Sequence, residues 1–418
     1  MKEKTQNKYA PKVVFWTSFF VIVFAFVAIT SDSLGYKLPV LVPDTRNASL
    51  YDFSHKQPFY ENTSSGKSTF TARNTFHTSS PKNISTTTIS NMTTTIDSKS
   101  LAVMKTHVAF LKVHKAGSTT MQNLFFRFGI RHNLNILLPR RGNYLNSPGQ
   151  KLPLKSGQHY DIFACHTVYN TKWFKSLLPA DSVNIAIVRE PVERMISSAY
   201  YYRDIFGVKY LKRIPSGNFI HNLVNFPEKY NSAFFSQTRN SMGKDFGFRN
   251  GIQQNEKDQI KSYLDKLNSE FLLVMIMEKF DESLVMLKRL LNWSFIDIIY
   301  LKTNSHKHNP IVLNATEIAN FRKTSYLDYE IYDYFTEVFE TKLKTIGNDF
   351  YDEVKFFQNV LDRVHDFCSA GKEASSVSIL SSKWDKQFEV KTSDCQLMNT
   401  KEIQFINKLR SNTMKRRK

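Results

Sequence analysis

The chain has 418 residues, of which 41% are hydrophobic and 14% aromatic, a composition that fits a folded enzyme better than a disordered binding segment. A formal net charge of +20 at pH 7 predicts anionic partners such as a nucleotide, an acidic glycan, a nucleic acid or lipid headgroups. The three cysteines show no spacing typical of metal ligands.

The N-terminus predicts a membrane anchor. Residues 13–30 form an uncharged apolar run of 18 residues, near the lower limit for a helix that crosses a bilayer. Residues 1–12 contain four lysines and one glutamate, which predicts a cytosolic tail and a lumenal remainder of the chain. A cleaved signal peptide is the alternative, but the run is longer than a usual signal core and no small-residue cleavage site follows closely.

Residues 31–105 are predicted to form a lumenal stalk. The part from Asn62 to Ser100 is dominated by Ser, Thr, Asn and Lys, so it has too little apolar surface to fold. Four glycosylation sequons lie in the stalk, and together they predict that it is glycosylated. The sequons begin at Asn47, Asn62, Asn83 and Asn91.

Residues 106–400 predict one folded domain of the α/β class, because apolar runs alternate there with helix-like stretches. This alternation predicts a mainly parallel central sheet flanked by helices, with ligands at the carboxyl ends of the strands. The predicted strands are 107–113, 160–165, 183–188 and 271–277. The predicted helices are 118–131, 191–203, 256–268, 281–291 and 327–345. Residues 401–418 are basic and are expected to be a solvated, mobile tail.

The cysteines are expected to play structural roles. Cys165 ends an apolar strand, which predicts a buried free thiol. Cys368 and Cys395 flank a polar stretch, and a lumenal compartment would permit a disulfide between them.

An anion site is predicted where the strand 107–113 leads through a short loop into the helix 118–131. A helix that starts in such a loop directs unpaired N–H groups and its positive dipole end toward the loop. Lys115 adds a cation, and Ser118, Thr119 and Thr120 add hydroxyl groups. The alternative is an ordinary turn in which a serine caps the helix.

The identity of the anion follows from what the loop lacks. It has no Gly-Lys pair of the ATP-binding type. The strand 183–188 ends in Arg189 and not in the aspartate that would hold magnesium. A cation in this place suits a phosphate site that works without a metal, which points to a nucleotide that donates sulfate.

Several segments resemble the galactose 3-O-sulfotransferase family. LKVHKAGSTTMQNLFFRF resembles the 5′-phosphosulfate loop of that family, and IVREPVERMISSAYYY resembles its 3′-phosphate segment. FLLVMIMEKFDESLVMLKRLLNW and RNSMGKDFGF resemble two further family stretches. The resemblance covers most of residues 106–335, and it implies a P-loop-like sulfotransferase fold for the domain.

The resemblance also implies the donor and the residues that bind it. The donor is 3′-phosphoadenosine 5′-phosphosulfate, and no metal is required. Lys115 acts on the transferring group, and Arg189 and Ser197 hold the 3′-phosphate. The 5′-phosphosulfate is expected on Lys115, Ala116, Gly117, Ser118, Thr119 and Thr120.

Two histidines are candidates for the base that removes the proton of the acceptor hydroxyl. His114 lies beside Lys115 in the donor loop, and His166 ends the strand 160–165 in a segment that resembles the catalytic strand of uronosyl 2-O-sulfotransferases. The sequence leaves the choice between them open, because either can accept a proton near neutral pH. Glu278 is the next candidate if neither histidine is the base.

The expected protein is therefore a single-pass type II Golgi sulfotransferase that modifies a galactose hydroxyl, in the first place the 3-hydroxyl, of a glycolipid such as galactosylceramide or of a glycoprotein. One alternative is a uronosyl 2-O-sulfotransferase acting on glycosaminoglycans. Another is a membrane-anchored glycan-binding protein without catalysis. Nucleic acid is not expected as a partner, and homodimer formation is left open.

Overall fold

The computed structural model describes residues 103–302, 310–370 and 375–417. The predicted cytosolic tail 1–12, the anchor 13–30 and nearly all of the stalk 31–105 lie outside the described residues. Within the described ranges, no helix combines the length and the apolar character needed to cross a membrane.

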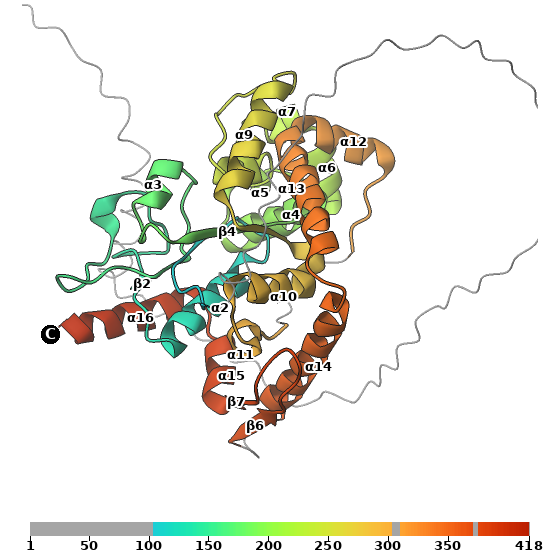
Figure 1. Ribbon diagram of the computed structural model, residues 1–418. Helices are drawn as coiled ribbons and strands as arrows, with labels where there is room; N and C mark the ends of the chain where they lie inside the picture. Colours follow the sequence, from blue (N-terminus) through green and yellow to red (C-terminus); the bar gives the residue numbers. More distant parts are fainter. Residues whose placement is uncertain (1–102, 303–309, 371–374, 418) are drawn as a thin grey trace, which may run out of the picture. The chain divides into compact units, whose positions relative to one another are not determined.

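A parallel sheet of five strands lies at the centre of the domain (Figure 1). Its spatial order is β2-β3-β1-β4-β5, and every pair of neighbouring strands runs parallel. All residues of β1 and β5 are buried, as expected for strands covered on both faces. The strands are β1 Val108–Leu111, β2 Ile136–Leu137, β3 Ile162–Phe163, β4 Val183–Val188 and β5 Leu273–Ile276.

One face of the sheet is covered by α2 (Ser118–Arg131) and α10 (Phe280–Leu291). Four further helices pack on this pair: α14 contacts α10, α15 and α16 contact α2, and α11 contacts both. Their bounds are α11 Phe295–Ile298, α14 Phe350–Ser369, α15 Thr392–Met398 and α16 Glu402–Arg417.

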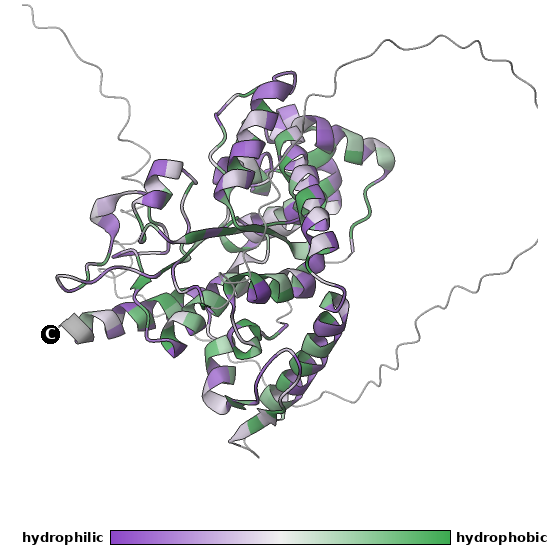
Figure 2. Cartoon of the chain, viewed as in Figure 1, coloured by the Kyte–Doolittle hydropathy of each residue, from purple (hydrophilic) through white to green (hydrophobic). Residues whose placement is uncertain are grey.

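The other face carries α13 (Tyr326–Thr345), which contacts β4 and β5 and also packs on α4, α8 and α9. Figure 2 shows that the central strands are hydrophobic, whereas the helices around them carry both hydrophobic and hydrophilic residues. A smaller apolar cluster joins α4, α6 and α12 beside this layer. The remaining helices are α3 Thr171–Lys175, α4 Pro191–Tyr200, α5 Lys209–Lys212, α6 Phe219–Asn225, α7 Pro227–Tyr230, α8 Ser241–Asp245, α9 Lys257–Glu270 and α12 Ala315–Thr324.

The predicted elements in the part of the chain that the structure describes are all present. The helix 118–131 has the predicted bounds, and the other predicted helices begin or end within three residues of their predicted bounds. The predicted helix 191–203 is α4, which continues as one π-helical turn, Tyr201–Ile205. The predicted strand 183–188 has the predicted bounds, whereas the strands predicted at 107–113, 160–165 and 271–277 are present but shorter.

The tail expected to be solvated is folded over part of its length. The segment Glu402–Arg417 is the helix α16, and its side chains at Phe405, Ile406 and Leu409 are buried against the core. Three apolar residues on one face are enough to dock this helix although the segment as a whole is strongly basic. The expectation of a mobile tail is therefore wrong for this segment.

The cysteines behave as the sequence suggested. A disulfide joins Cys368, near the end of α14, to Cys395 in α15, with 5.5 Å between the two Cα atoms. Cys165 is buried and free, and burial raises the pKa of its thiol to about 12, which keeps it protonated and unreactive. A small antiparallel hairpin, β6 Ser376–Ile379 and β7 Phe388–Lys391, lies between the two bonded cysteines in the chain.

Candidate active site

The loop between β1 and α2 has the backbone of an anion site. Lys115 and Gly117 both have positive φ angles, 62° and 71°, and among the described residues no side chain caps the N-terminus of α2. A Cβ atom at Gly117 would lie 2.3 Å from the sulfur of Met277, so only glycine fits there. The first N–H groups of α2 therefore lie uncapped at the loop, where an anion would be stabilised.

The loop residues do not all present their side chains as predicted. The Ser118 hydroxyl donates a hydrogen bond of 2.5 Å to the buried carbonyl of Val113, so it fastens the loop and does not face the anion site. Thr119 is exposed, and its hydroxyl lies 3.3 Å from a carboxylate oxygen of Glu402. Ala116 is buried, and its part in an anion site is limited to its backbone. Ser118 likewise contributes only its backbone N–H.

The structure brings Lys115 and Arg189 together. Arg189 donates a hydrogen bond of 3.4 Å to the Lys115 carbonyl, and the Lys115 ammonium lies 3.7 Å from the centre of the Tyr201 ring. Burial, together with the nearby charges of Lys112 and Arg189, lowers the pKa of Lys115 to about 8. The charge of Arg189 is thus near enough to lower the pKa of Lys115, and a bound anion would be attracted by both cations.

Ser197 is carried by α4, the helix that begins directly after Arg189 and Glu190. It is half-buried on α4, about two helical turns after Arg189, and within the described residues no hydrogen bond links it to Arg189 or to the loop. Its neighbour Ser198 is fully buried and donates to the carbonyl of Gln237, so Ser198 belongs to the core. Arg189 is instead paired with Glu193 at 3.1 Å.

His114 forms a pair with Asp245. The Asp245 carboxylate accepts hydrogen bonds from both the backbone N–H and the Nδ1–H of His114, at 2.8 and 2.9 Å. Because Nδ1 carries the proton, the lone pair of Nε2 is free to accept, and it lies 2.7 Å from the Tyr144 hydroxyl. Burial, with Asp245 and Glu402 nearby, raises the pKa of Tyr144 to about 12, so this hydroxyl stays protonated and is the donor.

His166 stacks on His114, but its two ring nitrogens have different hydrogen-bond partners from those of His114. The ring centres lie 4.2 Å apart, and His166 is buried. Its Nδ1 donates to the Lys112 carbonyl and its Nε2 accepts from the Lys112 ammonium, both at 3.1 Å. Burial, with the charges of Lys112 and His114, holds the pKa of His166 well below its usual value. His166 therefore stays neutral, and its only lone pair is already engaged.

Glu402 of α16 balances the buried charge of Lys112. Its carboxylate lies 3.3 Å from the Lys112 ammonium and 2.8 Å from the amide nitrogen of Asn143. Burial alone would raise the pKa of Glu402, but the charge of Lys112 and the hydrogen bonds from Asn143, Lys112 and Thr119 together lower it. Glu402 therefore remains ionised, and a segment predicted to be a tail reaches the donor loop.

A pocket of about 640 Å³ opens beside His114. Aromatic side chains and hydroxyl or amide groups line most of it, and Asp245 and Lys244 are the charged groups at its wall. Its aromatic lining residues are Tyr144, Tyr202, Tyr210, Tyr230 and Phe235. Aromatic faces with scattered hydrogen-bonding groups suit a neutral sugar, whose C–H faces stack on rings while its hydroxyls bind polar groups.

Sequence reasoning missed four residues of this site: Lys112, Tyr144, Asp245 and Glu402. A signal existed for Lys112, which is a lysine inside an apolar strand run, and for Asp245, which lies in the RNSMGKDFGF stretch. No local signal marked Tyr144 or Glu402. The fallback base Glu278 accepts hydrogen bonds from the backbone of Glu190 and from the hydroxyl of Tyr332, and within the described residues no hydrogen bond links it to His114.

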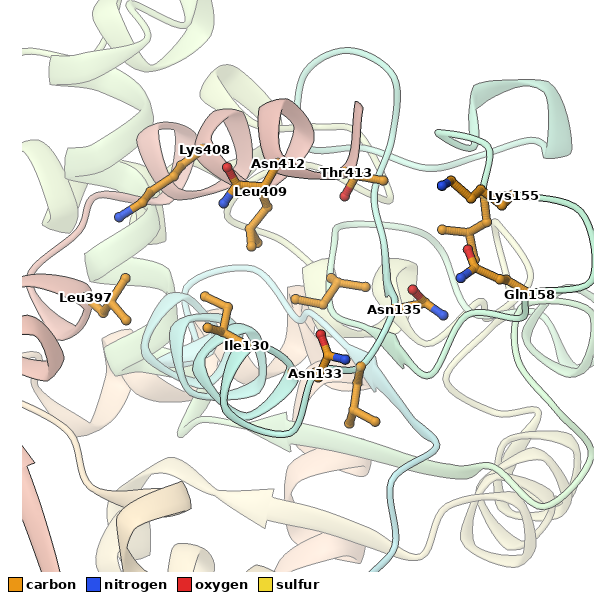
Figure 3. Close-up of a pocket in the computed structure, with 14 residues that line it drawn as sticks. Ile130, Asn133, Asn135, Lys155, Gln158, Leu397, Lys408, Leu409, Asn412 and Thr413 are labelled. Atoms are coloured by element: carbon orange, nitrogen blue, oxygen red, sulfur yellow. The ribbon is translucent and has the colours of Figure 1, made fainter. Parts of the chain in front are cut away.

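A second hollow, of about 580 Å³, lies at the far end of α2 (Figure 3). Ile130 and Asn133 line one side, and Lys408, Asn412 and Thr413 of α16 line the other. None of the predicted site residues lines this hollow, whereas His114 lines the first pocket. We therefore take the pocket beside His114 as the candidate active site.

Comparison with known sequences shows which proteins the chain is similar to. The sequence model of a family described as Galactose-3-O-sulfotransferase matches residues 68–413. The chain is 27% identical over 279 residues to human (Homo sapiens) galactosylceramide sulfotransferase, which covers 64% of this chain and 65% of the relative. It is 29% identical over 253 residues to galactose-3-O-sulfotransferase 2 of Mus musculus, covering 57% of this chain and 63% of the relative. The chain thus spans less than two thirds of each relative.

Proposed function

Because the chain belongs to the galactose-3-O-sulfotransferase family, we propose that it transfers the sulfuryl group of 3′-phosphoadenosine 5′-phosphosulfate to the 3-hydroxyl of a galactose residue. The acceptor would be a glycolipid such as galactosylceramide, or a glycoprotein. The observation that carries the proposal is the pair His114–Asp245, which lies between the donor loop and the aromatic pocket.

The donor would bind at the loop through the uncapped N–H groups of α2 and the ammonium of Lys115. The residues fit a dianionic phosphosulfate, because Lys115 supplies a cation and α2 supplies the positive end of a helix dipole. Arg189 would bind the 3′-phosphate, which competes with Glu193 for its guanidinium. Ser197 is the second proposed contact of that phosphate.

The base would be His114. In the proposed step Nε2 takes the proton of the galactose hydroxyl, that oxygen forms a bond to sulfur, and the bond from sulfur to the bridging oxygen breaks to release adenosine 3′,5′-bisphosphate. Asp245 holds Nδ1–H and stabilises the imidazolium that results. Lys115 offsets the negative charge that develops on the bridging oxygen.

The acceptor hydroxyl would replace the Tyr144 hydroxyl at Nε2. The 2.7 Å contact with Tyr144 supports this, because it marks a position from which an oxygen can donate to Nε2. The side chain of Tyr144 is 45% exposed, so it can move aside without opening the core. His166 would then act as a neutral ring that stacks on the His114 ring and holds it in position.

We also propose that the enzyme works in the Golgi lumen, anchored by the segment 13–30, which lies outside the described residues. The disulfide between Cys368 and Cys395 supports an oxidising compartment. The chemistry proposed for His114 and Lys115 has no step that needs a metal, and activity in the presence of a chelator would test this.

The test is transfer of radiolabelled sulfate from the donor to matched galactosides by the purified full-length chain. We expect transfer to a β-galactoside and to galactosylceramide, and none to the 3-deoxy analogue of the same galactoside. Transfer that persists on the 3-deoxy analogue would refute the position of sulfation. Transfer to a uronosyl 2-hydroxyl instead would favour the glycosaminoglycan alternative, and tight glycan binding without transfer would favour a binding protein.

A further inference from the structure

A second cluster of titratable side chains lies at the opposite edge of the sheet from the donor loop. His107 immediately precedes β1, His159 and Asp161 precede β3, and Asp181 precedes β4. Because β3, β1 and β4 are parallel neighbours, the residues before their amino ends meet at one edge. Three segments that are distant in sequence thus bring two imidazoles and two carboxylates together.

The distances in this cluster fit the coordination of a metal ion. The Nε2 atoms of His107 and His159 lie 3.2 and 3.0 Å from the same oxygen, Oδ1 of Asp161. The three ligand atoms all lie within 4.8 Å of one another. Two ligands on a tetrahedral zinc ion are separated by about 3.3 Å, given metal–ligand bonds of about 2.0–2.1 Å.

The hydrogen-bonding pattern of His107 is the second observation. Its Nδ1 lies 2.8 Å from Oδ1 of Asp181, while its Nε2 faces Asp161. A neutral imidazole has one N–H, so it can donate to only one of these two carboxylates. If Nδ1–H donates to Asp181, a cation bound between Nε2 and Asp161 would satisfy the second carboxylate. A histidine that binds a metal commonly donates its other ring N–H to a carboxylate in this way.

The second oxygen of Asp161 is also fixed. Oδ2 accepts a hydrogen bond of 2.6 Å from the backbone N–H of Asn135, which leaves Oδ1 turned toward the two histidines. Asp161 is buried, whereas the side chain of His159 is 61% exposed, so the cluster has a solvated side. A hollow of about 570 Å³ adjoins both histidines there. Lys151 also lines this hollow, but its ammonium donates a hydrogen bond of 3.2 Å to the carbonyl of Ser176.

We propose that His107, His159 and Asp161 bind one zinc ion, with water as the fourth ligand and Asp181 orienting His107. Two imidazoles with one carboxylate favour zinc over calcium or magnesium, which prefer oxygen ligands. The ion would tie the start of β1, the central strand of the sheet, to the start of its neighbour β3. The role is structural, because the site lies at the far end of β1 from His114.

The test is zinc binding by the purified full-length chain after removal of metals with a chelator. Titration against a fluorescent zinc indicator should give one site, and zinc should raise the thermal unfolding temperature. His159→Ala should weaken binding by at least about a hundredfold and abolish the shift, since it removes a ligand. Asp181→Asn should weaken binding by about ten- to a hundredfold, the usual effect of losing an outer-shell partner.

The matched control is His221→Ala, because His221 also pairs with a carboxylate, Glu317 at 2.8 Å, but no third ligand joins them in the described part of the chain. This variant should bind zinc as the unchanged chain does. Equal zinc binding by the His159→Ala variant, or no binding by the unchanged chain, would overturn the proposal. Binding of adenosine 3′,5′-bisphosphate should be the same in all of these variants, so the outcome is independent of the function proposed for the donor loop.

Discussion

The carboxyl ends of β1 and β3 each deliver a histidine to the same crevice, yet the neighbours of the two rings differ. After β1, His114 has a carboxylate on Nδ1 and an accessible hydroxyl on Nε2. After β3, His166 has a carbonyl on Nδ1 and an ammonium on Nε2. A neighbouring carboxylate favours a proton on an imidazole ring, and a neighbouring cation opposes it. The surroundings of His114 therefore suit a proton acceptor, whereas those of His166 suit a ring that stays neutral.

The largest expected effect is on His114. His114→Ala should lower the turnover number by about a hundred- to ten-thousandfold, since it removes the base, and leave the affinity for adenosine 3′,5′-bisphosphate nearly unchanged. Steady-state rates together with calorimetric titration measure both quantities. His132→Ala is the matched control, because His132 is also held by an aspartate, Asp297 at 2.9 Å. More than about a tenth of the rate in the His114→Ala variant would show that His114 is not the base.

Replacing the partner of His114 should have the next largest effect. Asp245→Asn places an amide at Nδ1 that can donate to it, which moves the ring proton to Nε2 and removes the lone pair facing the acceptor. We expect a loss in turnover of about a hundredfold or more, as in other histidine–aspartate pairs. Measurement of the rate against pH would show whether the loss extends over the whole range. A loss confined to substrate affinity would contradict the proposed role of Asp245.

A third prediction concerns the charge of Lys115. Since the pKa of Lys115 is about 8, its ammonium loses its proton as the pH rises through that value. A bound anion favours the charged form, so donor affinity should be highest below pH 8 and fall about tenfold between about pH 7.5 and 9.5. Lys115→Arg should flatten this dependence, because a guanidinium stays charged. An equally steep fall in the Lys115→Arg variant would exclude Lys115 as the titrating group.

The smallest effect on rate is expected at His166. His166→Phe keeps an aromatic ring behind His114 but removes the acceptor of the Lys112 ammonium. Turnover should fall less than about tenfold. The free energy of unfolding, measured by chemical denaturation, should decrease by about 1–3 kcal/mol because a buried donor loses a partner. A rate loss as large as that of His114→Ala would reverse the assignment of the two histidines.

Elements with a strong local pattern could be predicted from the sequence. The helix 118–131 was predicted with its observed bounds because Met121, Leu124, Phe125 and Phe128 repeat with helical spacing. The parallel order of strands followed from the alternation of strands and helices. The helix α14 was missed although Phe350, Val354, Phe357 and Val364 are spaced on one helical face, so the signal was present there.

Other features depend on contacts between distant segments and have no local signal. β2 is two residues long and is defined only by its pairing with β3. α16 has few apolar residues, and its docking depends on the surface offered by α2. The choice between His114 and His166 required the positions of Asp245 and of the Lys112 side chain, which the sequence alone does not fix. The two candidate histidines could thus be proposed from the sequence, but their partners and their protonation could not.

The ion pair between Lys112 and Glu402 has a consequence for biosynthesis. The two residues are 290 positions apart, so at a synthesis rate of about 5–20 residues per second Glu402 is made about 15 to 60 s after Lys112. During that interval the strand β1 cannot bury Lys112 beside its balancing carboxylate, and an unpaired buried ammonium is strongly unfavourable. The central strand of the sheet should therefore reach its final packing only after translation has passed α16, which makes folding of this domain a late event in the life of the nascent chain.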